Sequence, residues 1–229
     1  MKPYILSENN WKNIKKSSYE LAILPWGATE AHNYHLPYAT DNIEAESIIS
    51  ESGKIAWEKG SKFIILPTIP FGINTGQKDI LLDINLNPST QQMILDDVIA
   101  VLNRQGIYKL LVFNGHGGNN AVLELSIQWI RNNLKFWAYL FNIGEIAQER
   151  WNKSKMGVQD NPRKVLHADK IETSMVLSIA PDKVKQTRIV PKSGKNKTKI
   201  LESSFIGSLG WNAKDMGDSG VIGDPTGAT

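Results

Sequence analysis

Short apolar runs alternate with longer segments of helical periodicity along this chain of 229 residues. Runs of aliphatic and aromatic side chains bounded by turn residues predict buried strands at 19–25, 62–67, 109–113 and 136–141. Apolar side chains at helical spacing predict helices at 41–59, 87–105, 120–132 and 171–179. Residues 80–86 alternate imperfectly between apolar and polar side chains, which predicts an edge strand or a hairpin arm.

Alternation of short buried strands with helices is typical of βαβ units around a parallel sheet. We therefore expect an α/β fold, a single domain over residues 1–229 in which helices flank a mostly parallel central sheet in three layers. In such sheets, ligands bind beyond the carboxyl ends of the strands. Polar motifs directly follow the first and third predicted strands, so both should open at the same edge of the sheet.

Composition narrows the class of protein. The chain has no cysteine, which excludes disulfides and thiolate metal sites and fits a reducing cytoplasm. The N-terminus is unlike a secretory signal, and no run approaches the ~20 apolar residues that span a bilayer. A net charge of +3 is too small to indicate a polyanionic partner. We expect a cytoplasmic protein with no membrane or nucleic-acid partner.

Two segments near the C-terminus have unusual composition. Residues 183–199 are rich in lysine and arginine and contain no acid, which is typical of a solvated surface segment. A nucleic-acid contact is the alternative, but the segment has no interleaved aromatic side chains for base stacking. Residues 217–227 are glycine-rich and match no phosphate-binding fingerprint.

All four histidines fall inside short polar motifs rather than in ordinary apolar stretches. They are His32 and His35 in residues 30–37, His116 in residues 114–119 and His167 in residues 167–174. Each motif also brings a carboxylate or a cluster of exposed backbone. Imidazole beside carboxylate is the ligand mixture for Zn, Mn or Fe at a catalytic site. The placement of the histidines therefore predicts a metal-dependent hydrolase.

The first motif brings three candidate ligands. Glu30 and His32 are two residues apart, so in an extended segment their side chains leave the same face. Asp41 stands at the expected start of a helix, where it is either a ligand or a helix cap. Glu, His and Asp together, after a strand and before a helix, favour a metal site over a surface acid and a cap.

The central motif surrounds His116 with Gly115, Gly117 and Gly118. Glycine permits a positive φ and close approach of backbone. A histidine in such a loop at the ligand edge favours a functional role over a structural hydrogen bond. His35 is either a support for a ligand from behind or an anchor for the turn before Pro37.

The third motif holds His167, Asp169 and Glu172. Five residues correspond to roughly 140° around a helix, so His167 and Glu172 would not share a helix face. We expect His167 to precede the helix and Glu172 to lie in its first turns. Glu172 is a candidate ligand, and His167 is a candidate proton shuttle, because imidazole exchanges protons near neutral pH. Asp169 is either a further site carboxylate or a stabiliser of the helix N-terminus.

Four motifs, in this order, resemble the creatininase (creatinine amidohydrolase) family. They are residues 24–37 (LPWGATEAHNYHLP) with Thr40 and Asp41, then 114–119 (NGHGGN), 167–174 (HADKIETS) and 220–225 (GVIGDP). The resemblance extends from about residue 20 to the C-terminus, and the first two motifs are highly specific. It implies an α/β fold and a two-metal centre that hydrolyses a non-peptide C–N bond, usually in a cyclic amide or formamide. It also implies a homo-oligomer, commonly a hexamer.

The resemblance also implies roles for particular residues. Glu30 and His116 would hold one metal, His32 would hold the second, and Asp41 would bridge them. His167 matches the family's active-site histidine. We expect two divalent metal ions per chain, with Zn ahead of Mn and Fe.

The chain departs from the family pattern at three places. Creatinine-hydrolysing members carry a glutamate ligand where this chain has Gly118, and Glu172 is the natural replacement, as the fifth ligand and a candidate catalytic residue. Residues 71–79 lack the histidine and the Pro-Gly-Thr turn of many relatives, so substrate contacts there should differ. Relatives usually continue beyond the last motif into a helix, so we expect this chain to lack that helix.

These inferences favour a metal-dependent amidohydrolase in which metal-activated water cleaves a C–N bond of a small cyclic amide, amidine or formamide. One alternative is a deformylase or peptidase of the same family. Another is a non-catalytic binding or assembly protein stabilised by metal. A third alternative, a basic nucleic-acid-binding protein, is supported only by residues 183–199.

Overall fold

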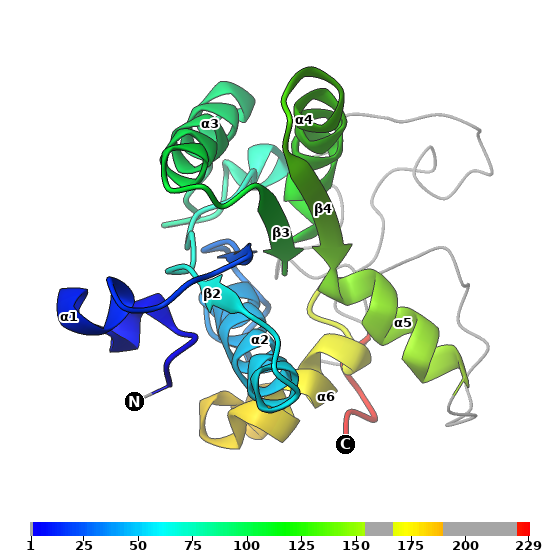
Figure 1. The fold of residues 1–229 in the computed structure, drawn as a ribbon. Coiled ribbons are helices and arrows are strands. Elements are labelled where there is room, and N and C mark those ends of the chain that lie inside the picture. The colour runs from blue at the N-terminus through cyan, green and yellow to red at the C-terminus, as the bar shows by residue number, and fades with distance from the viewer. Residues whose placement is uncertain (1, 154–166, 190–223) are drawn as a thin grey trace.

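The computed structural model describes residues 2–153, 167–189 and 224–229 (Figure 1). The strands are β1 (Leu21–Trp26), β2 (Phe63–Ile65), β3 (Lys109–Asn114) and β4 (Trp137–Asn142). The α-helices are α1 (Trp11–Ile14), α2 (Thr40–Glu58), α3 (Pro88–Arg104), α4 (Asn120–Asn133), α5 (Ile143–Lys153) and α6 (Lys170–Ile179). Short 3₁₀ helices are η1 (Leu6–Glu8), η2 (Thr75–Gln77), η3 (Gly117–Asn119), η4 (Pro181–Lys183) and η5 (Gln186–Arg188).

The four strands form one sheet in the order β2-β1-β3-β4, and every neighbouring pair is parallel. From β1 the chain builds outward to β2, and it then builds in the opposite direction through β3 and β4. The strand order therefore reverses between β1 and β3, which is where open α/β sheets bind ligands. Trp26 pairs with Asn114, so the carboxyl ends of β1 and β3 are level.

Helices cover both faces of the sheet, which confirms the expected three-layer α/β fold (Figure 1). On one face, α3 and α4 bury Leu95, Ile99, Leu123 and Ile130 against the inner side chains of β1 and β3. On the other face, a second cluster includes Ala45 and Ile49 of α2 and Ile143 of α5. Helix α6 packs mainly on α2 and α5.

The hydrophobic pattern predicted every strand of the sheet and four of its helices to within a few residues. The prediction of an edge strand or a hairpin arm at residues 80–86 is wrong. That segment makes only isolated bridges, from Ile84 to Thr29 and from Asn85 to Gly72. Leu81 and Leu82 are largely exposed, and Leu82 has a φ of 60°, outside the strand region. The sequence pattern missed α5, which follows β4 without a loop and has a glycine as its second residue.

The basic segment is solvated where the structure describes it, because Lys183, Lys185 and Arg188 are exposed. Its remainder, residues 190–199, and the glycine-rich residues 217–223 lie outside the described residues. No helix in the described part of the chain is long and apolar enough to cross a membrane.

Candidate metal centre

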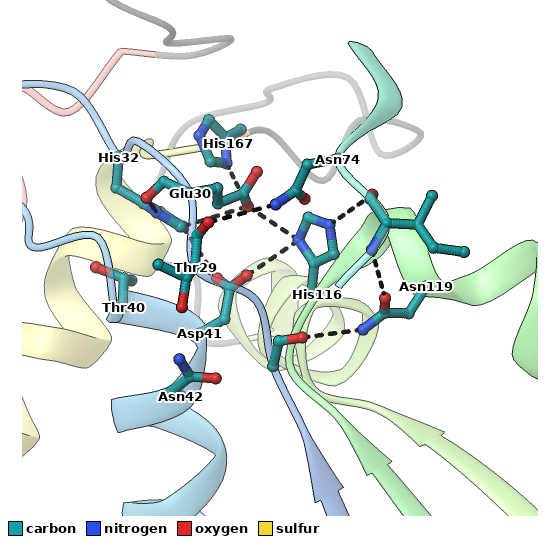
Figure 2. A network of polar contacts seen from close by, with 12 residues as sticks. Thr29, Glu30, His32, Thr40, Asp41, Asn42, Asn74, His116, Asn119 and His167 are labelled. Carbon is teal, nitrogen blue, oxygen red and sulfur yellow. Dashed lines mark hydrogen bonds and ion pairs between the residues drawn. The ribbon is translucent and has the colours of Figure 1, made fainter. Parts of the chain in front are cut away.

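The sheet topology brings the histidine motifs together at the switch point. Glu30 and His32 lie in the loop between β1 and α2, and Asp41 is the second residue of α2. His116 lies two residues beyond the end of β3. His167 and Glu172 lie around the start of α6. Figure 2 shows side chains from three of these segments pointing toward one another, as the strand order predicted.

Two buried carboxylates meet His116. Glu30 Oε1 lies 2.9 Å from His116 Nδ1, and Asp41 Oδ2 lies 3.0 Å from the same nitrogen. The other oxygen of the Asp41 carboxylate faces a different histidine, with Oδ1 3.0 Å from His32 Nε2. Glu172 Oε1 approaches that His32 nitrogen to 3.5 Å. Asp41 therefore belongs to two clusters, one with Glu30 and His116 and one with His32 and Glu172.

His167 lies against the first cluster. Its Nε2 is 2.6 Å from the carbonyl oxygen of Ala31, and its Nδ1 is 3.5 Å from Glu30 Oε1. A carbonyl oxygen only accepts, so Nε2 donates this hydrogen bond and Nδ1 is the ring nitrogen that faces Glu30. The ring centroid lies 4.3 Å from that of His32, and the two ring planes are tilted by 46°. His167 thus presents Nδ1 to the site.

The donor atoms fit a metal better than they fit one another. Glu30 Oε1, His32 Nε2 and Asp41 Oδ2 make no aligned hydrogen bond with a described residue, although each has a charged neighbour at about 3 Å. Within each cluster the ligand atoms all lie within 4.8 Å of one another. Lone pairs that converge on common points, from imidazole nitrogen and carboxylate oxygen, suit Zn, Mn or Fe.

The charges of the site are strongly coupled. Burial by itself raises the pKa of the Glu30 and Asp41 carboxyls, but His116 beside Glu30 and His32 beside Asp41 bring both below their ordinary values. Burial by itself lowers the pKa of His32 and His116, but Glu172 and Asp41 around His32, and Glu30 and Asp41 around His116, raise both well above the ordinary value. Buried carboxylates at this density require positive charge between them, which protons or metal ions supply.

The structure distinguishes the roles of two carboxylates, Asp41 and Asp169, for each of which the sequence allowed two roles. The helix-cap interpretation of Asp41 is wrong, because the N-cap of α2 is Ala39 and the Asp41 side chain points at the histidines. Asp169 is the N-cap of α6 and accepts hydrogen bonds from the backbone N–H groups of Ile171 and Glu172. Of the two roles that the sequence left open for Asp169, the structure shows the one at the helix N-terminus.

His35 belongs to neither cluster. Its Nε2 lies 2.8 Å from Thr173 Oγ1, and both side chains are buried. This contact ties the first motif to α6 next to Glu172. The Glu172 Oε2 atom also accepts a 2.5 Å hydrogen bond from the backbone N–H of Ala168. These two contacts hold the start of α6, and with it the Glu172 carboxylate, against the site.

The glycines beside His116 serve close approach and not a positive φ. None of Gly115, Gly117 and Gly118 is among the described residues with positive φ, so that part of the expectation is wrong. A Cβ at Gly118 would overlap the carbonyl oxygen of Ile73 and lie 2.5 Å from His116 Nε2. That carbonyl instead accepts a 3.1 Å hydrogen bond from Nε2, which leaves Nδ1 of His116 for the two carboxylates.

Gln77 is a site residue that the sequence did not single out. It is buried in η2, and its side-chain amide donates to Glu30 Oε2, which leaves Oε1 for the histidines. The segment that carries it follows β2, whose carboxyl end lies at the same edge of the sheet. In the sequence, the only sign that Gln77 belongs to the site was that it is a polar residue on this segment. Residues 71–79, where we expected this chain to differ from its relatives, thus include a residue that supports the candidate metal ligand Glu30.

Replacing Gln77 with methionine should weaken metal binding by about 10- to 100-fold, because partners that orient a ligand have effects of this size. The measurement is competition with a chromophoric chelator at fixed pH. Lys78→Ala, an exposed change in the same turn, is the control and should bind metal like the parent. Parent-like affinity in Gln77→Met would show that Glu30 needs no such support.

A cavity of about 320 Å³ opens beside the two clusters. Its walls include Glu30, Asp41, His116 and Glu172 of the clusters, residues 73–77, and the starts of α5 and α6, but not His32. Lysine and arginine are absent from its lining among the described residues, whereas six carboxylates line it. These are Glu30, Asp41, Glu44, Glu145, Asp169 and Glu172. The volume lies at the small end of the range for ligand pockets.

The fold and the donor set define an α/β protein with a candidate metal centre at the topological switch point. The family model described as creatinine amidohydrolase matches residues 7–229, so the chain belongs to the creatininase family, as its motifs indicated. It is accordingly a hydrolase acting on carbon–nitrogen bonds.

Curated relatives carry two different names. The chain is 22% identical to a mycofactocin precursor peptide peptidase of Mycolicibacterium smegmatis over 217 residues, which covers 93% of this chain and 78% of the relative. It is 23% identical to a creatinine amidohydrolase of Pseudomonas putida over 210 residues, which covers 82% and 76%.

Solved structures share the fold over the whole chain. A crystal structure from Bacteroides fragilis, provisionally named a creatinine amidohydrolase, has a TM-score of 0.84 at 28% identity, covering 100% of this chain and 88% of that chain. A creatinine amidohydrolase (creatininase) crystal structure has a TM-score of 0.77 at 19% identity, covering 100% and 90%.

Proposed function

We propose that this protein is a metal-dependent amidohydrolase with two divalent ions per chain. Glu30, Asp41 and His116 would hold one ion, and His32, Asp41 and Glu172 would hold the other. The observation that carries the proposal is the Asp41 carboxylate, whose two oxygens lie 3.0 Å from nitrogens of two different histidines. A carboxylate in that position is placed to bridge two ions.

Zinc is the metal we propose, with manganese or iron as alternatives. The donors are imidazole and carboxylate without thiolate, a mixture that all three metals accept. Creatininase structures related in fold are named for Mn in one case and for a Zn–Zn site in another. These names support a metal centre of the same kind in this chain.

Divalent ions in such a site supply a nucleophilic water at neutral pH and polarise the carbonyl oxygen of the substrate. The protein residues hold this chemistry in place. His167, whose Nδ1 lies 3.5 Å from Glu30 Oε1, is the side chain we propose to take a proton from the attacking water. The Ala31 carbonyl fixes the ring through Nε2. Gln77 and Ile73 hold Glu30 and His116 from behind.

The substrate we propose is a small amide, amidine or formamide other than creatinine. The cavity volume supports a small molecule. The glutamate that the family resemblance implies for creatinine-hydrolysing members is Gly118 here, and the Ile73 carbonyl leaves no room for a side chain. A peptidase is the second candidate, supported by the name of the mycobacterial relatives. Homo-oligomer formation and a cytoplasmic location stay predictions.

Metal analysis followed by a substrate panel tests the proposal. We expect about two metal ions per chain and cleavage of a cyclic amide or a formamide. Creatinine should be turned over with a kcat/KM below the roughly 10⁴ M⁻¹s⁻¹ at which ordinary substrates begin. The panel includes a short peptide, whose cleavage would favour the peptidase. Full metal content without turnover of any compound would favour a binding or assembly protein, and efficient creatinine hydrolysis would refute the exclusion of creatinine.

A further inference from the structure

Glu44 is a buried carboxylate of the cavity that the metal clusters do not use. It follows Asp41 by three residues on α2, so the two side chains share one face of the helix. Its side chain lines the cavity, and the residue is 1% exposed. It belongs to none of the groups of side chains close enough to hold an ion among the described residues.

The Glu44 carboxylate forms no ion pair with a described residue. Its Oε1 atom makes no hydrogen bond with any described residue. Burial, then the negative charges of Glu172 and Asp41, raise the pKa of Glu44 well above its ordinary value, and only His32 opposes them appreciably. A buried polar atom left unpaired destabilises the protein, and a partner from a ligand would remove that penalty.

The described part of the cavity wall contains histidines and side-chain amides, but none of them bonds Glu44 Oε1. Lysine and arginine are absent from the described lining. A cationic nitrogen bound beside Glu44 would favour the ionised carboxylate against burial and the charges of Glu172 and Asp41. Glu44 itself would remain an acceptor within reach of a bound substrate. The amide oxygen Oε1 of Gln77, also buried and unpaired among the described residues, adds a second acceptor to the wall.

We propose that Glu44 is a specificity-determining residue that accepts a hydrogen bond from a cationic nitrogen of the substrate and excludes substrates with a carboxylate at that place. The proposal rests on the dinuclear amidohydrolase proposed above, because the metal ions would fix the scissile amide and Glu44 would bind a group a few ångströms away. Three residues along a helix correspond to a rise of about 4.5 Å, which sets the reach required. A substrate with an amino group about three methylenes from its amide carbon fits this spacing.

Three hydroxamic acids that differ only at the end of the chain test the inference. 4-Aminobutanohydroxamic acid ends in ammonium, pentanohydroxamic acid ends in methyl, and glutaric monohydroxamic acid ends in carboxylate. The hydroxamate group binds metal in all three, so binding of the neutral compound tests the metal centre and the ranking of the ends tests Glu44. The measurement is calorimetric affinity for the zinc-loaded protein.

We expect the ammonium compound to bind at least about tenfold more tightly than the methyl compound, and the carboxylate compound at least about tenfold more weakly, because buried charge-assisted hydrogen bonds are strong and buried like charges repel. In Glu44→Gln the ammonium preference should fall below about threefold, while the affinity of the methyl compound stays within about threefold of the parent. Glu46→Gln, an exposed change on the same helix, is the matched control and should keep the parent ranking.

The outcomes separate the two proposals. If no hydroxamate binds the zinc-loaded protein, the proposal of a metal centre is wrong, and the proposed role of Glu44, which depends on it, is wrong as well. If the methyl compound binds as tightly as the ammonium compound, the metal centre stands and the role of Glu44 is overturned, a result that needs only the parent protein. An ammonium preference that survives Glu44→Gln would also overturn it.

Discussion

Replacing Asp41 with asparagine should remove most of the bound metal and lower hydrolytic activity by at least about 10³-fold. Asparagine keeps the shape of the side chain but offers one neutral carbonyl oxygen in place of two anionic oxygens. Those two oxygens face His116 and His32 at 3.0 Å, so both clusters lose a ligand together. Removing a single preorganised electrostatic partner of a transition state costs about 10²–10³-fold, and here two ions are affected.

Metal content after dialysis, measured by plasma emission spectroscopy, checks this result. Glu172→Gln should lose metal from one cluster only and keep about half of the parent content. Asp169→Asn is the matched control: it removes a carboxylate from the same cavity wall, and asparagine caps a helix about as well as aspartate. Equal metal content in Asp41→Asn and the parent protein would refute the bridging role.

Replacing Gly118 with alanine should destabilise the protein by about 3 kcal/mol and weaken metal binding, although the change adds one methyl group. The new Cβ would overlap the carbonyl oxygen of Ile73 and lie 2.5 Å from His116 Nε2. Both groups belong to the support of the site, so the loop or the imidazole must move. Overpacking of this kind costs about 1–3 kcal/mol, and more when backbone has to shift.

Gly117→Ala is the control for this experiment, one residue away in the same motif. A Cβ at Gly117 would meet nothing within 4 Å, and Gly117 is not among the described residues with positive φ. Chemical denaturation of the two variants compares their stabilities, and chelator competition compares their metal affinities. We expect Gly117→Ala to be within about 0.5 kcal/mol of the parent. Similar stability in the two variants would show that the segment around Ile73 moves away from position 118 at little cost in free energy.

The Gly118 contact also bears on the choice of substrate. A glutamate introduced at position 118 would meet the same obstruction before its carboxylate reached a metal ion. Residues 71–77 and the central motif are therefore packed closely against each other, and we expect that a change at position 118 alone would not supply the ligand that the family resemblance implies for creatinine-hydrolysing members. The candidate replacement, Glu172, comes from α6 on a different side of the site.

The sequence by itself determined the order of the four strands and of the helices α2, α3, α4 and α6, and the edge of the sheet at which the histidine motifs meet. Runs of apolar side chains and turn residues are local features, so they predict these elements without knowledge of the fold. Parallel strands end at a common edge, which predicts that His32 and His116 lie near each other. The four motifs in order also identified the family. The same local rules failed at residues 80–86, where Leu81 and Leu82 face solvent.

Only the tertiary structure decided which side chains meet and what each carboxylate does. Asp41 and Asp169 both stand at helix starts in the sequence, yet one faces two histidines and the other caps α6. The support of Glu30 by Gln77, and the Ile73 carbonyl over Gly118, join segments that are far apart in the chain. Such contacts depend on the packing of loops against one another. The residue pattern of a single segment does not show which distant segments will pack against it.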